Sequence, residues 1–311
     1  MITLTQFHYF LVVADEQNFT KAAKRLYISQ QSLSMHIQSI EKELNTKLFL
    51  RTIPLKLTES GRVFQEYARS IMFSYREMCR HINDMSNRQN GIYRFGISHT
   101  RGELILPQIL PVLQKEFPSV SFRVTEGTYE ELQKKLIQGT VDLIIEQLPF
   151  SDDRIMGIPL CEDQICMLVS RGFLDEHFGK DADTVLAKLY DTGCILPEIA
   201  DCPFLLNNTG NSIRAKIETI LLSEKIDPEC KIATDNMNAL LNLCSSDCGI
   251  AFYPKFFLNT TGQDRTPSNV YTIPLKYEVA NYTLGIGYRK DSYRSKISSR
   301  IGELVKQYSE T

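Results

Sequence analysis

The sequence has no apolar run near the roughly 18–20 residues that a membrane span needs. Its N-terminus has no basic stretch followed by an apolar one, so no secretory signal is expected. The eight cysteines include no C-x-x-C pair and no metal-type spacing with the histidines, so we expect free thiols and no metal site. Together these absences predict a cytoplasmic protein that contacts no membrane.

Motifs of the common enzyme classes are missing as well. The chain has no G-x-S-x-G, no H-E-x-x-H, no phosphate-binding loop and no G-x-G-x-x-G between a strand and a helix. The segment most similar to the last of these motifs is Gly285-Ile286-Gly287, which lies inside an expected strand. The five histidines are scattered along the sequence. We therefore expect no catalytic residue and no cofactor.

Length, composition and charge indicate a protein of more than one domain. The 311 residues exceed the ~100–200 of a typical domain, and the 43% hydrophobic and 23% charged content is ordinary for globular proteins. The charge is uneven: residues 1–90 carry 12 Lys and Arg against 8 Asp and Glu, and the remaining residues carry 23 against 29. A mildly basic N-terminal part followed by an acidic remainder is consistent with an N-terminal domain that binds nucleic acid.

Three short helical patterns open the chain. Apolar residues recur at helix spacing in three segments between residues 4 and 44, and Asn18 and Ser29 are expected to cap the second and third helices. A β-leaning stretch follows at residues 48–57. Three short helices followed by a hairpin indicate a winged helix-turn-helix domain over residues 1–58.

A long fourth helical pattern begins after the capping residue Thr58 and ends in a turn at residues 87–91. Its apolar residues alternate at spacings of four and three, which is the a/d pattern of a coiled coil. The pattern predicts a linker helix over residues 59–90 that pairs two chains, and packing on its own domain is the alternative. The expected dimerisation residues are Phe64, Ala68, Ile71, Tyr75, Met78, Ile82 and Met85.

From residue 92 onward strands and helices alternate, which predicts a parallel α/β sheet. The expected strands are residues 93–98, 120–126, 141–147, 165–170, 204–207, 249–253 and 284–289. The expected helices are residues 103–116, 129–138, 212–224, 237–244 and 295–308. The body is long enough for two small lobes, so the fold class is an α+β multidomain protein.

The third helix carries the expected DNA-reading face. In a helix-turn-helix protein this helix lies in the major groove and offers its first turns to base edges. Placing the apolar residues inside leaves an uncharged outer face, on which Gln can bond adenine and Met35 can contact a thymine methyl. The expected base contacts are Gln31, Ser32, Ser34, Met35 and Gln38. An ordinary solvated helix face is the alternative.

Residues 18–61 resemble the DNA-binding head of the LysR family of transcriptional regulators. The matching positions are Phe19-Thr20, Ala22-Ala23, Leu26, Ser29-Gln30, Leu33-Ser34, Ile37, Glu41, Leu44, Leu48-Phe49, Arg51, Leu57-Thr58 and Gly61. Gly96-Ile97, Pro107, Phe117-Pro118, Asp142-Leu143, residues 236–254 and the C-terminal helix also look like the family. The resemblance implies sequence-specific DNA binding and adds Thr20 and Gln30 to the expected contacts.

The head departs from the family pattern at three places. Gln31-Ser32 stands where Pro and Ala are common, and Met35 stands where Arg is common. The wing is one residue shorter than usual and contains Pro54. The departures bear on base preference, whereas Arg51 and Lys56 remain placed to meet phosphate or the minor groove, which predicts salt-dependent binding.

For residues 91–311 the resemblance implies a two-lobed domain like the type 2 periplasmic binding proteins, with an effector between the lobes. Lobe 1 is expected at about residues 91–163 and 271–311, and lobe 2 at about 164–270. Helix N-termini that follow strand ends also favour binding of an anion there. The expected effector-binding residues are Ser98, Thr100, Arg101, Thr128, Glu146, Gln147, Asn207, Asn208, Thr209 and Asn236. Helix capping is the alternative role for the Ser, Thr and Asn side chains.

The expected function is a DNA-binding transcriptional regulator controlled by a small, anionic or polar effector. Its expected partners are a pseudo-palindromic double-stranded DNA site, further copies of the chain in a dimer or tetramer, and RNA polymerase. The alternative is a thiol-based redox sensor of the same fold that uses Cys194 and Cys202. Against it, Ser212 stands where the peroxide-sensing relatives carry their reactive cysteine.

Overall fold

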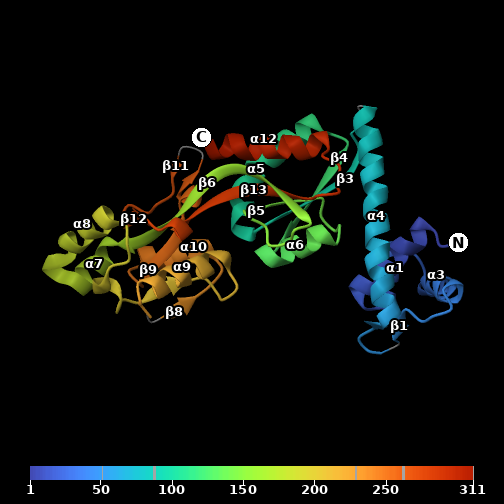
Figure 1. The fold of residues 1–311 in the computed structure, drawn as a ribbon, viewed down its shortest axis with the longest axis horizontal. Helices are drawn as coiled ribbons and strands as arrows, with labels where there is room; N and C mark the ends of the chain where they lie inside the picture. Colours follow the sequence, from blue (N-terminus) through green and yellow to red (C-terminus); the bar gives the residue numbers. More distant parts are fainter. Residues whose placement is uncertain (51, 87–88, 228–229, 261–262, 311) are drawn as a thin grey trace.

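The computed structural model describes residues 1–50, 52–86, 89–227, 230–260 and 263–310. A small helical head, one long helix and a two-lobed body follow one another, and the long helix stands between the head and the body (Figure 1). Within the described residues, no helix has the length and apolar character required to cross a membrane. Arg51 of the expected wing and residues 87–88 of the expected turn lie outside the described residues.

The head consists of three helices and a two-stranded wing, in agreement with the sequence patterns. Its elements are α1 (Leu4–Glu16), α2 (Phe19–Leu26), α3 (Gln30–Glu43), β1 (Phe49–Leu50) and β2 (Lys56–Leu57). Thr3, Asn18 and Ser29 each accept a backbone N–H with their side chain, which fixes where the three helices begin. One apolar core joins the helices, and Phe10 and Leu33 are fully buried in it.

The long helix α4 (Glu59–Met85) begins at Thr58, whose Oγ1 accepts a backbone N–H over 2.9 Å. Its first turns belong to the head, because the Phe64 ring packs against the rings of Phe7 and Phe10 with centroids 5.5 and 4.6 Å apart. Beyond these turns the helix leaves the head and runs along the body (Figure 1).

Gly61 permits the close approach between α4 and the wing. A Cβ atom at this position would lie 2.1 Å from the Leu48 carbonyl oxygen, so any larger residue would push the wing away from the helix. This contact explains why a glycine follows the helix cap in the sequence.

One mixed sheet of nine strands runs through the whole body. Its strands are β3 (Gly91–Ile97), β4 (Val120–Glu126), β5 (Leu143–Gln147), β6 (Ile155–Ser170), β7 (Phe204–Leu206), β8 (Cys230–Ala233), β9 (Ile250–Pro254), β12 (Val270–Pro274) and β13 (Asn281–Arg289). The order is β4-β3-β5-β13-β6-β9-β7-β8, and β12 also pairs with β6. Two short strands, β10 (Asn259–Thr260) and β11 (Gln263–Asp264), form a separate pair.

The prediction of a parallel sheet was wrong at the centre of the body. β3 runs parallel to β4 and β5, and β7 runs parallel to β8 and β9, as expected. However, β13 pairs antiparallel with β5 and β6, and β6 pairs antiparallel with β9 and β12. The 16-residue strand β6 leads from the first lobe into the second, and β13 leads back to the first lobe. The two strands that cross between the lobes therefore run antiparallel to each other.

Each lobe has its own apolar core. The helices of the first lobe are α5 (His99–Glu116), α6 (Tyr129–Ile137) and α12 (Lys296–Glu310), and those of the second are α7 (Arg171–Phe178), α8 (Ala182–Thr192), α9 (Ser212–Ser223), α10 (Met237–Ser245) and α11 (Lys255–Leu258). Short 3-10 turns lie at Gly179–Asp181, Pro197–Ile199 and Glu278–Ala280. In the first lobe α5 and α12 pack in one core, while α6 packs in a separate cluster with Ile144 of β5.

The second lobe extends further along the chain than the expected boundary at residue 271. β12 pairs with the second-lobe half of β6, and Leu275 and Ala280 are fully buried in the second-lobe core. The chain therefore returns to the first lobe with β13, which begins at Asn281. The sequence did not indicate this boundary, because a strand that pairs with a distant segment carries no local signal for its partner.

Candidate functional site: the DNA-reading face, the linker helix and the interlobe contact

The outer side of α3 presents the polar residues that were expected to read DNA. Gln31 and Met35 are exposed, Met35 by 63%, whereas Leu33 and Ile37 on the inner side are buried. A shallow groove of ≈ 560 Å³ lies along this face, lined by Gln6, Ser29, Gln31, Ser32, Met35, His36 and Ser39. The groove offers hydrogen-bonding groups and one apolar surface, which are the chemical groups that base edges require.

Two of the expected readers, Ser34 and Gln38, lie on the flank of α3 that faces the wing. They line a separate hollow of ≈ 240 Å³ beside β1, and the Gln38 amide donates to Ser34 Oγ over 3.5 Å. Thr20 Oγ1 donates to Gln30 Oε1 over 2.9 Å, which joins α2 to the first turn of α3. The expected reading face thus consists of two neighbouring strips.

Glu41 of α3 holds the wing in place. It is 8% exposed, and its carboxylate accepts from Lys47 Nζ at 2.7 Å and from the Leu48 backbone N–H at 2.9 Å. Burial by itself raises the pKa of Glu41, but these hydrogen bonds favour the ionised form and bring the pKa below its usual value. The expected phosphate contact Lys56 is exposed on β2, and Arg51 lies outside the described residues.

The seven expected dimerisation residues of α4 divide into two groups. Phe64 is half-buried and Ala68 fully buried, because this part of α4 packs on the head. The other five are exposed by 39 to 78% and form what we call the apolar stripe: Ile71, Tyr75, Met78, Ile82 and Met85. A row of exposed large apolar side chains is typical of a surface that is covered in an assembly.

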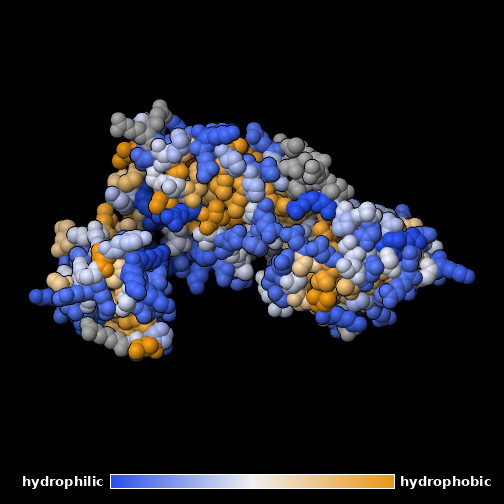
Figure 2. Space-filling model, turned by 180° about the vertical axis from the view of Figure 1, so that it is seen from behind, coloured by the Kyte–Doolittle hydropathy of each residue, from blue (hydrophilic) through white to orange (hydrophobic). Residues whose placement is uncertain are grey.

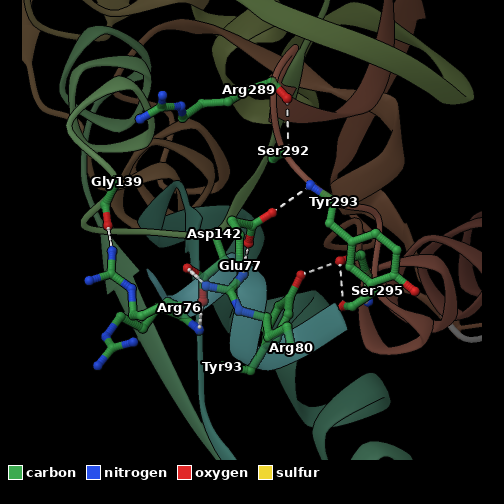
Figure 3. Close-up of polar contacts among 12 residues, drawn as sticks. Arg76, Glu77, Arg80, Tyr93, Gly139, Asp142, Arg289, Ser292, Tyr293 and Ser295 are labelled. Atoms are coloured by element: carbon green, nitrogen blue, oxygen red, sulfur yellow. Dashed lines mark hydrogen bonds and ion pairs between the residues drawn. The ribbon is translucent and has the colours of Figure 1, made fainter. Parts of the chain in front are cut away.

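The opposite side of α4 is fixed to the first lobe by buried charged groups (Figure 3). Arg80 Nη2 donates to Asp142 Oδ1 over 2.7 Å, and Arg80 Nη1 lies 2.7 Å from Glu77 Oε1. Arg76 donates to the Gly139 carbonyl oxygen. Burial raises the pKa of Glu77 and lowers that of Arg76 to about 10. We call this set of contacts the linker joint, and sequence analysis did not predict it.

Further contacts extend the linker joint to the segment between β13 and α12. The Arg289 guanidinium carbon lies 4.1 Å from the centroid of the Phe73 ring, and the Tyr293 ring stacks on His81 with centroids 4.1 Å apart. Asp84, which is 5% exposed, accepts the backbone N–H at the first residue of α12 over 2.9 Å. The linker helix is therefore attached to several elements of the first lobe.

A cavity of ≈ 960 Å³ lies beside the linker joint, between the first turns of α4 and the first lobe. Charged residues of both signs line it, namely Arg62, Glu66, Arg69, Glu130, Lys134, Asp152, Asp153, Arg154, Arg289, Lys290 and Asp291. Along the first turns of α4 this cavity lies between the helix and the first lobe. The contacts of the linker joint, further along α4, therefore attach the helix to the body.

Arg101 was expected to pair with a carboxylate of the effector, but it already has a partner in the protein. Its guanidinium donates to Glu146 Oε1, and the two residues are 5% and 1% exposed. The structure therefore corrects the expectation that either side chain is free to bind a ligand. An incoming anion would have to displace a buried carboxylate, which is costly unless the displaced charge finds a new partner.

Two of the other expected effector-binding residues cap helices, which is the alternative role that the sequence left open. Thr128 forms a capping box with Glu131 at the start of α6, and Asn236 accepts a backbone N–H at the start of α10. Ser98 precedes α5 without capping it, and its Oγ accepts from Arg101 over 3.2 Å.

The remaining expected residues lie at the same strand ends. Asn207 is 2% exposed and donates to the Thr234 carbonyl over 3.3 Å. Asn208 is exposed and donates to Asp235 over 2.8 Å. The last three, half-buried or exposed, are Thr100, Gln147 and Thr209. Of these three, Thr209 is open to solvent and lies before the cap of α9.

Four residues outside the expected set form a contact between the lobes. Asn238 of α10 donates to Glu103 of α5 over 2.8 Å, and His99 Nδ1 and Nε2 lie 2.8 and 3.4 Å from Glu126 and Glu103. The Glu126 carboxylate raises the pKa of the exposed His99 ring. We call this group the interlobe contact. His99 and Glu126 stand within two positions of residues that the strand-end rule did select, Ser98 and Thr100 on one side and Thr128 on the other, so the same rule would have found them had it taken in the neighbouring positions.

All eight cysteines are free thiols, and the burial of the two candidate thiols does not favour the redox alternative. Cys194 is half-buried and Cys202 is buried, and burial raises the pKa of Cys202 to about 11. A thiol with a raised pKa is little ionised at neutral pH and reacts slowly with oxidants. In the described part of the chain, no group of three or more His, Cys, Asp or Glu is arranged to hold a metal ion.

Comparisons with known families cover most of the chain. Residues 4–62 match the family described as "Bacterial regulatory helix-turn-helix protein, lysR family". Residues 86–309 match the "LysR substrate binding domain". The two matches correspond to the head with the start of α4 and to the two-lobed body.

Similar proteins match along nearly the whole chain. A probable RuBisCO transcriptional regulator of Synechocystis sp. is 27% identical over 99% of this chain and 87% of its own. A protein of Bacillus subtilis described as the uncharacterized HTH-type transcriptional regulator YcgK is 26% identical over 96% of this chain and 92% of its own.

Solved structures share the fold over the full length. A full-length OxyR variant from Pseudomonas aeruginosa is 21% identical, with a TM-score of 0.71 over 98% of both chains. CbnR in complex with its target DNA is 19% identical, with a TM-score of 0.61 over 98% of this chain and 99% of that chain. Given the winged head, the long linker helix, the two-lobed body and both family matches, the chain belongs to the LysR family of DNA-binding transcriptional regulators.

Proposed function

We propose that this regulator is controlled by a small molecule held between the two lobes of its body. The observation that supports the proposal is the arrangement of the lobes. They have separate cores, they are joined by the crossing strands β6 and β13, and they touch through the Glu103–Asn238 hydrogen bond of the interlobe contact. Two lobes connected by a narrow crossing can change their relative position when a ligand binds between them.

We infer that the effector is a hydrogen-bonding molecule that is neutral or carries a positive charge, rather than an anion. Arg101 is neutralised by Glu146, and three further carboxylates belong to this side of the lobes: Glu103 in α5, Glu126 at the end of β4 and Asp235 after β8. A carboxylate or phosphate ligand would meet like charges in this region, whereas an ammonium or amide group would find acceptors.

On the DNA side, we propose that α3 enters the major groove and that Arg51 and Lys56 of the wing meet the phosphates. Two chains pair through the apolar stripe and read two half-sites of a pseudo-palindrome, and pairs assemble into tetramers that contact RNA polymerase. CbnR has been solved with its target DNA and shares the fold of this chain, which supports the placement of the head.

A thermal-shift screen of the full chain tests the effector proposal. The panel contains amines, amino acids and amides together with matched carboxylates and phosphates. A ligand that binds only the folded protein stabilises it by about 2.7 kcal/mol at a hundredfold excess over Kd. We expect at least one stabilising compound in the first group and none in the second.

The variant Thr209→Val locates the binding site of any stabilising compound. Thr209 is exposed at a strand end, so removing its hydroxyl should reduce the shift without unfolding the lobe. Thr219→Val is the matched control, because Thr219 is an exposed residue on the outer part of α9 in the same lobe. A shift that is equal in both variants, or a screen in which only anions stabilise the chain, would contradict the proposal.

A further inference from the structure

Strand β5 connects the linker joint to the ion pair at the interlobe side of the first lobe. Asp142 immediately precedes β5, and Glu146 is its fourth residue. Side chains four residues apart on a strand point to the same face, and a strand rises about 3.3 Å per residue, so the two positions stand about 13 Å apart. One short strand therefore carries a carboxylate for each of the two regions.

Each carboxylate is buried and is held by an arginine from another element. The Asp142 side chain is 0% exposed and accepts from Arg80 of α4 and, over 2.8 Å, from the Arg94 backbone N–H of β3. The Glu146 side chain is 2% exposed and accepts from Arg101 of α5. Separating a buried ion pair leaves an uncompensated charge, so each carboxylate has to follow its arginine when that arginine moves.

The strand between the two carboxylates has no room to deform. Leu143, Ile144 and Ile145 are all 0% exposed, and β5 is paired with β3 on one side and with β13 on the other. The segment contains no glycine. Packed interiors respond to a displacement by moving as a unit rather than by local compression, so a shift at one end of β5 is felt at the other end.

We propose that β5 couples the Arg101–Glu146 ion pair to the Arg80–Asp142 ion pair, and that Asp142 is the positioning residue that sets the orientation of the linker helix. A ligand or a lobe movement that draws Arg101 away from Glu146 changes the position of β5, and Asp142 passes the change to α4. The use of this coupling by an effector rests on the proposed function, whereas the coupling itself is a property of the chain alone.

Hydrogen exchange of the full chain, measured without any ligand, tests the coupling. In Glu146→Gln the charge-assisted bond to Arg101 is lost, and we expect the amides of residues 77–84 in α4 to exchange at least about fivefold faster. The amides in the C-terminal half of α12 serve as an internal reference for loosening of the whole lobe and should change much less. Acceleration confined to residues near Arg101, or equal acceleration of α4 and α12, would overturn the proposal.

Reciprocity supplies the second arm of the experiment. A coupling free energy acts equally in both directions, so Arg80→Met should accelerate exchange at residues 99–103 of α5. Two substitutions more than about 10 Å apart that are not coupled change the exchange rates independently, so their factors of acceleration multiply to within about twofold. If the two ion pairs are coupled, the acceleration in the double variant Glu146→Gln/Arg80→Met should be smaller than the product of the two single accelerations. Independent effects in the double variant would refute the coupling.

Two further variants complete the experiment. Glu116→Gln breaks the exposed Arg300–Glu116 ion pair of the same lobe, with the same chemical change, and should leave α4 unaffected. Arg101→Lys removes the guanidinium that donates to Glu146 but keeps a positive charge beside it, so it replaces Glu146→Gln if that variant does not fold, and the same acceleration at residues 77–84 is expected. A compound that stabilises the chain while Glu146→Gln leaves α4 unchanged would uphold effector binding and refute the coupling.

Discussion

A single buried carboxylate decides how the wing sits on the reading helix. Glu41 is nearly inaccessible, and its two oxygens accept from Lys47 and from backbone N–H groups of the wing. These bonds bring its pKa below the usual value, so the ionised form is the one that stabilises the head. This contribution is fully present above the ordinary carboxyl pKa of about 4.3 and is lost as the pH falls through the lowered pKa.

The first prediction is that Glu41→Gln destabilises the head by about 1–3 kcal/mol at neutral pH, because a charge-assisted acceptor is replaced by a neutral one. Hydrogen exchange of α1–α3 amides across a urea series measures the change. The difference from the wild type should shrink as the pH is lowered. Glu43→Gln, on the exposed side of the same helix, should stay within about 0.5 kcal/mol of the wild type. Equal losses in both variants would argue against the role of Glu41.

At the scale of the element, α3 illustrates what periodicity determines. Its apolar positions recur at helix spacing, so the sequence is enough to assign the inner face and the outer face, and Leu33 and Ile37 are indeed buried. Its start at Gln30 follows from the capping residue Ser29. What periodicity does not show is the division of the outer face into a groove beside Met35 and a hollow beside the wing.

We expect Gln31→Ala to weaken binding to the specific operator by about 1–3 kcal/mol and to leave binding to unrelated duplex DNA nearly unchanged, because we propose that Gln31 reads a base edge. Footprinting of the region upstream of the gene supplies the operator, and fluorescence anisotropy on operator and scrambled duplexes measures both affinities. Gln114→Ala on the exposed surface of α5 is the control. An equal loss on both duplexes would instead assign Gln31 to phosphate contact or to the fold.

At the scale of the whole molecule, α4 joins the head to the first lobe and leaves one of its sides exposed. Its first turns complete the head, its middle is fixed to the first lobe, and the apolar stripe remains exposed. Figure 2 shows that hydrophobic side chains also gather on the face of the first lobe that is turned away in Figure 1. Both surfaces are consistent with the assembly that we propose.

We propose that two chains pair through the apolar stripe, so we expect Ile82→Asp to raise the dissociation constant of the dimer at least about tenfold, because the substitution would bury an unpaired charge there. Analytical ultracentrifugation across micromolar concentrations measures the change. Asn83→Asp introduces the same charge about 100° further around the helix, outside the stripe, and should leave the dimer intact. A dimer that persists in Ile82→Asp would show that the chains pair through another surface.

The expected strands and helices that the structure contains share one property: their signals are local. β4 and α9 carry their own apolar pattern and their own flanking turns, and they begin where the sequence predicted. Sequence analysis missed the helices α7 and α8, and it also missed the strand β12, whose partner in β6 lies a hundred residues away. The evidence for a strand such as β12 arises only when the two distant segments pair in the folded chain.

The sequence by itself determined the head, the long helix, the alternation of the body and the family, because caps, periodicity and motif spacing are encoded within a few turns of chain. Only the tertiary structure decided that Arg101 is neutralised by Glu146, that Arg80 pairs with Asp142, and that the lobes touch through Asn238. The reason is physical: a charged side chain has no fixed role until folding brings it a partner. The partners of these residues lie 45, 62 and 135 positions away along the chain.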